Sequence, residues 1–423
     1  MGQSVAQKII ARAAGRDSVA AGEYVNVSPD FTCCQEISWS ARKAIMERAG
    51  RTRMERPEKS VFVVDHTTSA AMGTPYYRAH REMKDYAQSQ GAHFFGPGSG
   101  LRHHVMTENG FARPGALIFS DEPNIATVGV VGALNVPISS EVVVTQLGDR
   151  NWMVVPRPVR FTLKGQFAAG VLARDLVQTI IRDFAESDQL SQSCVEYAGP
   201  AIAELSLDAR QSLLACTYHA GADSALMPVD DCALAYARAR TGQEAFELFE
   251  SDPDTEYTFE TSYDLGEVAP MVTAPPDLHL AARVDRHAGT RIDQAALGSC
   301  ANSRLEDMRA AAAVLRGRRV AQHVTFYITP GSREIYAACA REGLLEVFME
   351  AGATVLAPGC TTCWGYEGFM NAGEVQISTH QMNYHGRNGH RESRSYLASP
   401  YTVAASAVAG QICDPRDFLR APT

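Results

Sequence analysis

The sequence predicts an α/β fold with mainly parallel sheets, and three observations lead to this prediction. Short apolar runs recur along the chain, they end in polar or glycine-containing turns, and helical patterns follow several of them. Repeated strand, loop and helix is typical of α/β proteins with parallel sheets. No fixed repeat period stands out.

The expected elements follow in chain order. Strands are expected at three apolar runs that precede such turns: Val61–Val64, Ala116–Phe119 and Val324–Thr329. Apolar spacing of three and four predicts a helix over Val171–Phe184, and alanine-rich composition predicts another over Met308–Leu315. The pattern from Ser303 to Glu306 resembles a capping box, so this second helix should begin just after it.

A chain of 423 residues is too long for one ordinary core, so several domains are expected. The clearest boundary is Ser251–Asp277, a run rich in acids, proline and threonine that we interpret as an extended crossover. A weaker boundary lies near Pro156–Pro158. The sequence therefore predicts α/β domains at residues 1–157, 158–278 and 279–423.

Composition excludes several classes of function. The net charge of −9 argues against a general nucleic-acid binder, which needs a basic surface. No segment approaches the ~18 apolar residues of a membrane span, and the N-terminus has no apolar signal core. A cytoplasmic location is expected, where the ten cysteines would be mostly reduced and a disulfide framework is not expected.

Three cysteines carry the strongest chemical signal. Cys300 lies in Gly298–Arg304, and Cys360 and Cys363 form a C-x-x-C motif sixty residues later. Thiols in two glycine-containing turns can hold three irons of a cubane and leave the fourth iron open as a Lewis acid. Gly359 is expected to let the backbone approach such a cluster without a Cβ clash.

Two other interpretations of these cysteines stay open from spacing alone. A C-x-x-C motif in a cytosolic protein is often a redox pair or half of a zinc site. The Pro-Gly flank does not fit a thioredoxin-like pair. Zinc would need a fourth ligand, which one of three nearby histidines offers: His380, His385 and His390. A chain without any metal is the third possibility.

Several motifs together resemble the aconitase superfamily, most closely the large subunit of 3-isopropylmalate dehydratase. In the C-terminal part they are Gly298–Ala312, Pro330-Gly-Ser, Glu350-Ala-Gly-Ala, Pro358–Cys363 and Gly386-Arg387. In the N-terminal half they are Asp65-His66, His103, Glu108, Pro114-Gly115, Gly129–Ala133, Val195–Gly199 and Ala220–Ala222. The likeness covers essentially the whole chain and is most specific over residues 295–413.

This resemblance implies three stacked α/β/α domains around a [4Fe–4S] cluster held by Cys300, Cys360 and Cys363. It implies a hydro-lyase or isomerase that removes and re-adds water on a hydroxy-acid, with the open iron polarising the hydroxyl. The family's general base is a serine on a separate swivelling domain. Because the chain has about the length of the family's large subunit, that domain is expected to be absent, and a small-subunit partner is expected to supply the serine.

At several positions this chain has the same residue as the family. Asp65 and His66 match the pair that protonates the departing hydroxyl, and His103 matches a second active-site histidine, with His104 as the alternative. Arg387 matches an arginine that grips a substrate carboxylate. Ser332, in the Pro330-Gly-Ser motif, is expected to contact substrate.

Other positions depart from the family, and the departures concentrate where relatives contact substrate. The usual Asp-Ser-His-Thr is Glu122-Pro-Asn124-Ile here, so Glu122 replaces an acid and Asn124 replaces a histidine. A family Asn is Ala215, and a family Glu is His219. Asn-Arg-Asn-Phe becomes Gln381-Met-Asn-Tyr384, which removes an arginine. Glu122 is expected to be catalytic, and Asn124, His219 and Gln381 to bind an altered substrate.

Three functions follow as hypotheses. The first is a [4Fe–4S] hydro-lyase or isomerase of a small hydroxy-carboxylate related to 2-alkylmalates. The second keeps the cluster but dehydrates a non-standard substrate without rehydration, in specialised metabolism or catabolism. The third is a non-catalytic metal-binding scaffold or sensor. Without the family pattern, His66 and His103 would be interpreted as turn or surface histidines and Glu122 as a solvated loop acid.

Overall fold

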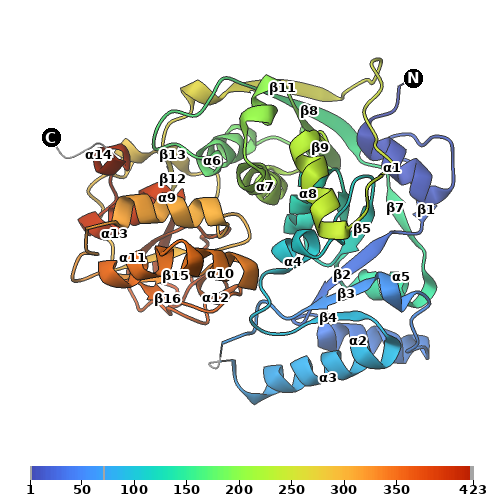
Figure 1. Cartoon of the computed structure of the whole chain (residues 1–423), viewed down its shortest axis with the longest axis horizontal. Helices are drawn as coiled ribbons and strands as arrows, with labels where there is room; N and C mark the ends of the chain where they lie inside the picture. Colours follow the sequence, from blue (N-terminus) through green and yellow to red (C-terminus); the bar gives the residue numbers. More distant parts are fainter. Residues whose placement is uncertain (1, 70–71, 420–423) are drawn as a thin grey trace.

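Parallel sheets organise the computed structural model, which describes residues 2–69 and 72–419. Three mainly or wholly parallel sheets carry the chain, and a two-stranded antiparallel ribbon joins β1 (Tyr24–Val27) to β7 (Asn151–Val154). The predicted α/β class is confirmed. Figure 1 shows the three sheets with their helices grouped around the middle of the molecule.

The first sheet has five parallel strands in the order β4-β3-β2-β5-β6. Its strands are β2 (Phe31–Gln35), β3 (Ser60–Val63), β4 (His93–Phe95), β5 (Leu117–Ser120) and β6 (Leu134–Pro137). The helices of this part are α1 (Val5–Ala14), α2 (Trp39–Ala49), α3 (Thr74–Gln90), α4 (Arg102–Glu108) and α5 (Val142–Gly148). The strands expected at 61–64 and 116–119 are confirmed, each shifted by one residue.

The second sheet has four parallel strands in the order β10-β9-β8-β11. They are β8 (Arg157–Lys164), β9 (Ser193–Ala198), β10 (Ser224–Leu226) and β11 (Phe259–Asp264). Its helices are α6 (Ala173–Phe184), α7 (Leu207–Cys216) and α8 (Asp231–Thr241). The helix expected over 171–184 is therefore confirmed as α6, and β11 lies inside the segment that we expected to be only a crossover.

The third sheet has seven strands in the order β13-β12-β18-β17-β14-β15-β16, antiparallel only at the β13-β12-β18 edge. They are β12 (Met271–Thr273), β13 (Ala281–Arg283), β14 (Gln294–Leu297), β15 (Thr325–Ile328), β16 (Thr354–Val355), β17 (Val375–Ser378) and β18 (Arg394–Ala398). Its helices are α9 (Leu305–Leu315), α10 (Arg333–Arg341), α11 (Leu344–Ala351), α12 (Thr361–Trp364), α13 (Pro400–Ala409) and α14 (Arg416–Leu419). The domain limits at 157 and 278 stay a prediction.

Short 3-10 turns complete the described elements. They are η1 (Pro57–Lys59), η3 (Pro123–Val131), η4 (Ser139–Glu141), η5 (Pro200–Glu204), η6 (Thr217–Ala220), η7 (Leu265–Glu267) and η8 (Val284–Arg286). The turn η3 joins two parts of the molecule, because it packs against α7 and β10 of the second sheet and against β6 of the first. Its side chains from Ile125 to Val131 are buried.

The start of α9 differs in one respect from the prediction. The helix begins after Arg304, whose backbone N–H donates to Asp307 Oδ2 over 2.9 Å. Ser303, the expected cap, instead donates its hydroxyl to the Ser299 carbonyl over 2.7 Å. The helix is where the sequence placed it, but the predicted capping residues are wrong by one position because Ser303 is used inside the Cys300 loop.

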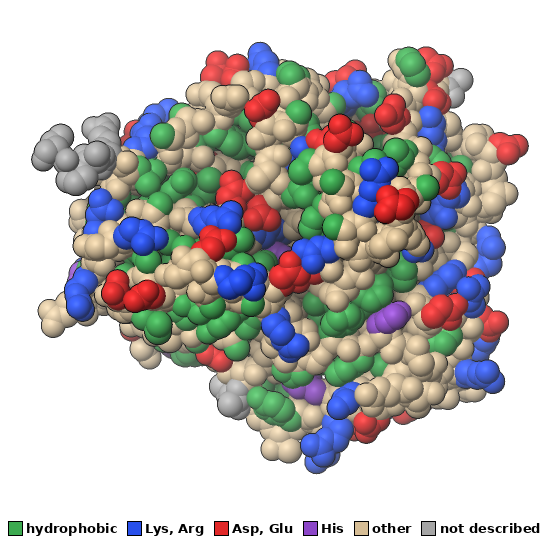
Figure 2. Space-filling view, in the orientation of Figure 1, with side chains coloured by type: hydrophobic (Ala, Val, Ile, Leu, Met, Phe, Trp, Pro, Cys, Tyr) green, Lys and Arg blue, Asp and Glu red, His purple; other side chains and the backbone are tan. Residues whose placement is uncertain are grey.

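Buried apolar clusters hold these layers together. One cluster joins the first and second sheets and includes Val63, Ile118, Phe161 and Leu213, all 0% exposed. Burial of each such side chain contributes about 1.5–3 kcal/mol. A second cluster lies in the third sheet around Phe326 and Phe348. Acidic and basic side chains are interspersed over the face shown in Figure 2. No helix of the described ranges is both long and apolar enough to cross a membrane.

Candidate active site

The carboxyl ends of strands from two sheets meet at one place. Glu36, Asp65 and Glu122 lie just after β2, β3 and β5 of the first sheet, and Cys300 and Gln381 lie just after β14 and β17 of the third. The backbone N–H of Cys360 donates to the Asp65 carbonyl over 2.7 Å, which ties the two edges together. Ligands of open parallel sheets bind at such edges, so this junction is the candidate active site.

The three cysteines lie in one buried contact cluster. Cys300, Cys360 and Cys363 are 9%, 8% and 3% exposed and pack with Leu101 and Trp364. The Cys360 thiol donates to Cys363, and this hydrogen bond lowers the pKa of Cys363 well below its usual value against the opposing effect of burial. The structure thus brings together two cysteine loops that are separated by sixty residues.

Gly359 lies against the loop that carries Asp65, while its expected approach to a cluster stays a prediction. A Cβ at this position would lie 2.8 Å from Thr68 Oγ1 and 3.2 Å from the Asp65 carbonyl. The close approach that needs glycine is therefore between the Cys360 loop and the Asp65–Thr68 loop. This approach brings the loop of Cys360 beside the loop of the acid–histidine pair.

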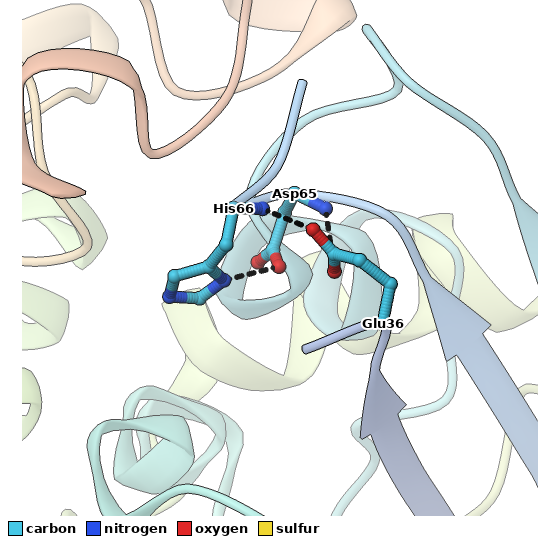
Figure 3. A group of neighbouring side chains, drawn as sticks. All are labelled: Glu36, Asp65 and His66. Atoms are coloured by element: carbon cyan, nitrogen blue, oxygen red, sulfur yellow. Dashed lines mark hydrogen bonds and ion pairs between the residues drawn. The ribbon is translucent and has the colours of Figure 1, made fainter. Parts of the chain in front are cut away.

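Glu36 holds this loop in place (Figure 3). Its Oε1 accepts from the backbone N–H groups of His66 (2.8 Å) and Thr67 (2.6 Å), and its Oε2 accepts from that of Asp65 (3.3 Å). Oxygen and nitrogen atoms of Glu36, Asp65 and His66 lie within 4.8 Å of one another, as metal ligands would. Because the Glu36 oxygens already accept these backbone donors, we interpret Glu36 as a positioning residue.

Asp65 and His66 form a directly bonded pair. His66 Nδ1 lies 2.7 Å from Asp65 Oδ1, and the other Asp65 oxygen accepts from the Arg102 N–H over 3.0 Å. Burial opposes charge on both groups, but their mutual attraction outweighs it. The pKa of Asp65 is therefore lowered and the pKa of His66 is raised. The His66 ring meets the Trp364 ring edge-on, with centroids 5.2 Å apart, and Trp364 in turn packs against the cysteine cluster.

A second acid–histidine pair lies beside the first. Glu122 Oε2 is 2.9 Å from His103 Nε2 and 3.1 Å from Arg102 Nη2. Burial works to raise the pKa of Glu122, but His103 and Arg102 outweigh it and hold that pKa below its usual range. The alternative histidine, His104, bonds Ser303 Oγ over 3.1 Å, and burial lowers its pKa.

Two residues that we expect to bind substrate each have a buried polar atom without a protein partner. These are Asn124 Oδ1 and His219 Nε2. Burial lowers the pKa of His219 to about 4, helped by Arg174 and opposed by Glu122 and Cys363. A buried polar atom without a partner is costly, so each of these atoms is available to a ligand.

Gln381 is engaged by protein groups. Its Nε2 donates to Cys300 Sγ over 3.1 Å, and its Oε1 accepts from Arg174 Nη1 over 3.2 Å and from the Cys216 thiol over 3.1 Å. Arg174 Nη2 also donates to the His380 carbonyl over 2.6 Å. The second sheet's helices α6 and α7 thereby support the cysteine loop, while the expected contact of Gln381 with substrate stays a prediction.

Arg387 and Ser332 occupy different surroundings. The Arg387 guanidinium lies 4.9 Å from the Trp364 ring centre, Nη1 donates to Tyr384 Oη over 3.2 Å, and Nε has no protein partner. It therefore belongs with the cysteine cluster. Ser332 caps α10 and donates to Glu108 Oε1 over 2.6 Å, so its hydroxyl is already bonded, and its role toward substrate stays a prediction.

Sequence reasoning missed three supporting residues: Glu36, Arg102 and Arg174. Glu36 follows a strand, which is the signal that led to Asp65, but the run before it is short. Arg102 precedes His103 directly, and its contacts with Asp121 and Glu122 depend on β5 lying beside β2. Arg174 contacts Gln381 across 207 positions, and no local pattern indicates such a pair.

Comparisons with known proteins give matches over nearly the whole chain. The family model described as "Aconitase family (aconitate hydratase)" matches residues 7–289 and 279–410. The chain is 34% identical to the 3-isopropylmalate dehydratase large subunit 1 of Methanopyrus kandleri, over 99% of this chain and 100% of that one. It is 34% identical to the probable methanogen homoaconitase large subunit of Methanothermobacter thermautotrophicus, over 98% and 97%.

A solved structure shares the fold. The holo-form of aconitase X from Thermococcus kodakaraensis superposes with a TM-score of 0.54 at 11% identity, covering 99% of this chain and 96% of that one. The site and these matches define an enzyme of the hydro-lyase class. The chain belongs to the aconitase family. Within residues 2–69 and 72–419 there is no separate fourth domain of the swivelling kind.

Proposed function

We propose that the chain is the large subunit of a two-subunit, [4Fe–4S]-dependent hydro-lyase or isomerase that acts on a small hydroxy-carboxylate related to 2-alkylmalates. The observation that carries this proposal is the junction itself: three buried cysteines lie against Asp65-His66 and Arg387. An acid, a cation that can bind a carboxylate and a set of thiols that can hold a cluster suit a cluster-assisted dehydration of a hydroxy-acid.

The cysteines fit a cluster better than a single zinc ion. In a tetrahedral zinc site with bonds of about 2.3 Å, sulfurs lie roughly 3.8 Å apart. The three cysteines are not among the described residues whose ligand atoms all lie within 4.8 Å of one another. Because Cys360 and Cys363 are hydrogen-bonded to each other, Cys300 Sγ is then more than 4.8 Å from at least one of their sulfurs. Each thiolate of a cubane binds a different iron, so a cluster accepts this distance more readily than one zinc ion does. The Gln381 N–H aimed at Cys300 Sγ suits a thiolate held in this way.

Cys300, Cys360 and Cys363 would hold the cluster, which when bound supplies a Lewis acid for the substrate hydroxyl. Arg387 binds a substrate carboxylate, since its stacked guanidinium offers parallel donors. His66, held by Asp65, donates a proton to the departing hydroxyl. His103 with Glu122 forms a second proton-carrying pair, and Arg102 links the two pairs through its backbone N–H to Asp65 and its guanidinium to Glu122.

The base that removes the proton from the neighbouring carbon is proposed to come from a small-subunit partner. The relatives are named large subunits, which supports a partner for this chain. We propose that a swivel-domain protein closes over the junction and brings a catalytic serine. In such an arrangement the chain alone binds substrate but does not complete turnover.

The test is to purify the chain without oxygen and measure iron, sulfide and the broad visible absorption of a thiolate-bound cluster, alone and for Cys300→Ser. We expect close to four irons per chain in a [4Fe–4S] state and loss of the absorption in the variant. Addition of the partner should give dehydration of a 2-alkylmalate, followed by the absorbance of the unsaturated acid. Full activity in a protein free of iron would contradict the proposal. Product that is never rehydrated would identify the dehydration-only alternative.

A further inference from the structure

A cavity of about 640 Å³ lies between the first and second sheets, outside the junction that holds the cysteines. Its lining comes from β6, the edge strand of the first sheet, from β10, the edge strand of the second, and from β7 of the antiparallel ribbon. None of the three cysteines and neither acid–histidine pair is among the described residues that line it. The volume is in the range of pockets that bind small molecules.

The walls of this cavity are mainly apolar, and part of them is exposed. Leu134 and Met153 form buried wall, whereas Val144 and Trp152 line the cavity with 45% and 63% of their surface exposed. The Trp152 ring lies 5.8 Å from that of Tyr24, which is also exposed. Exposed apolar side chains that rim a hollow are typical of ligand sites. An apolar body placed here would remove them from water.

The charged side chains of the lining are all acidic. They are Glu141 and Asp223, and no lysine, arginine or histidine occurs among the described residues that line the cavity. Glu141 does not cap α5 with its side chain, and neither carboxylate forms an ion pair with the described part of the chain. Partial burial raises the pKa of Asp223 and no neighbouring cation opposes this effect. The cavity therefore favours a cation and disfavours an anion.

One buried polar atom of the lining lacks a strong partner. Ser224 is 3% exposed, and its Oγ has no nitrogen or oxygen partner among the described residues. Its neighbour on the paired strand is the thiol of Cys194, a weak hydrogen-bonding group. A buried hydroxyl without a good partner is costly, so an N–H donor of a ligand in the cavity would stabilise it.

Asn135 connects the cavity to the candidate active site. It lies on β6 and lines the cavity, yet its side chain reaches the loop after β5. Its Oδ1 accepts from Ser120 Oγ over 2.7 Å, and its Nδ2 donates to the Pro123 carbonyl over 3.5 Å. Because Glu122 lies between these two partners, a ligand that contacts Asn135 acts on the support of the Glu122 loop.

We propose that this cavity is a regulatory site for a small organic cation, an amine with an aromatic or branched apolar body, which acts on the Glu122 loop through Asn135. The apolar walls bind the body, Trp152 and the two acids attract the charged head, and Ser224 Oγ accepts a hydrogen bond from it. The binding of the amine is independent of the proposed function. Its regulatory effect rests on that function, since it assumes that Glu122 takes part in the reaction.

The first test compares three probes that share one ring and linker but differ in charge: 2-phenylethylamine, 2-phenylethanol and 3-phenylpropionate. Their dissociation constants are measured by calorimetry on the full chain. Wild type should bind the amine about threefold or more tightly than the alcohol and at least about tenfold more tightly than the acid, as exposed carboxylates and an aromatic face allow. Equal or tighter binding of the acid, or binding of none of the probes, would overturn the proposal.

Two variants locate the binding in the cavity. Asp223→Asn should weaken binding of the amine about threefold to tenfold and leave the alcohol unchanged, while Asp285→Asn, at an exposed acid of η8, should change neither. Val144→Lys should weaken binding of the amine and strengthen that of the acid, and Met349→Lys, at an exposed position on α11, should not. Affinities that neither cavity variant alters would show that the amine binds elsewhere.

The regulatory effect is tested by hydrogen exchange on the same protein saturated with 2-phenylethylamine. Exchange should slow at residues 134–138 and 223–226, and also at residues 120–124 because of the bonds of Asn135. Slower exchange at β6 with unchanged exchange at residues 120–124 would overturn the regulatory effect. That result would leave the proposed function untouched, since no substrate or cluster enters the measurement.

Discussion

The side-chain amide of Gln381 donates from Nε2 to Sγ of Cys300 over 3.1 Å, and this bond links the cysteine loop to the second sheet through Arg174. A hydrogen bond to a cluster thiolate lowers the electron density on the sulfur and so raises the reduction potential of the cluster. Through this contact Gln381 would affect a bound cluster by way of Cys300.

Gln381→Leu should therefore lower the reduction potential of the reconstituted cluster, since it removes a bond worth about 1 kcal/mol. The measurement is an electrochemical titration followed by electron paramagnetic resonance. Gln189→Leu, at an exposed position, is the matched control. An unchanged potential in Gln381→Leu would show that the contact does not tune the cluster.

Glu36→Gln should destabilise the fold and slow the reaction. One of its two oxygens becomes an NH2 group that cannot accept from the backbone N–H donors of residues 65–67. We expect a loss of about 1–3 kcal/mol in the free energy of unfolding, measured by denaturant titration. We also expect a fall in kcat of about 10²-fold, because Asp65-His66 loses its support.

The control for this change is Glu82→Gln, which breaks an exposed pair with Lys43. Exposed pairs are worth about 0–1 kcal/mol, so this variant should keep both stability and kcat. Equal behaviour of the two variants would show that Glu36 does not position the loop.

Arg387→Lys should weaken substrate binding more than it slows the chemical step. Lysine keeps the charge but loses the planar stacking on Trp364 and the paired donors. We expect KM to rise by about 10–100-fold with a smaller change in kcat. Steady-state kinetics checks this, with exposed Arg391→Lys as the control. A variant with unchanged KM and lowered kcat would place Arg387 in the chemical step instead.

Glu108→Gln should alter the dependence of stability on pH. Burial raises the pKa of Glu108 to about 7, against the opposing effect of its bond from Ser332. The folded state thus binds a proton that the unfolded state releases near 4.5, so stability from this group is present below that pH and is lost as pH rises toward 7.

An amide at this position stays neutral at every pH and still accepts from Ser332. Glu108→Gln should match wild type near pH 4, below the unfolded pKa, and be more stable at pH 8, by about 1–3 kcal/mol. Urea unfolding at both pH values measures the difference. Burial also raises the pKa values of Asp175 and Asp307, but both residues are present in wild type and in the variant. Their effect on stability therefore cancels when the two proteins are compared. A difference between the proteins that does not vary with pH would contradict the prediction.

The sequence by itself determined most of the elements and indicated that Cys300, Cys360 and Cys363 lie in two glycine-containing turns. The alternation of apolar runs and turns gave α/β with parallel sheets, because the strand and helix periods are local properties. It identified the helix after Cys300, although not its cap, since Ser303 has a competing carbonyl partner that no local pattern reveals. Asp65, His66 and Glu122 follow predicted strands, but only the resemblance to the aconitase superfamily singled them out, because polar residues after strands are common in turns.

Only the tertiary structure decided which side chains are in contact and which polar atoms already have a protein partner. Gln381 and Arg174 are 207 residues apart, and Glu36 reaches the next strand's loop because β2 and β3 pair in one register. His103 rather than His104 faces Glu122, since α4 turns the two rings to different neighbours. Burial then sets the protonation of each group, and burial is a property of the packed chain that residue order alone does not determine.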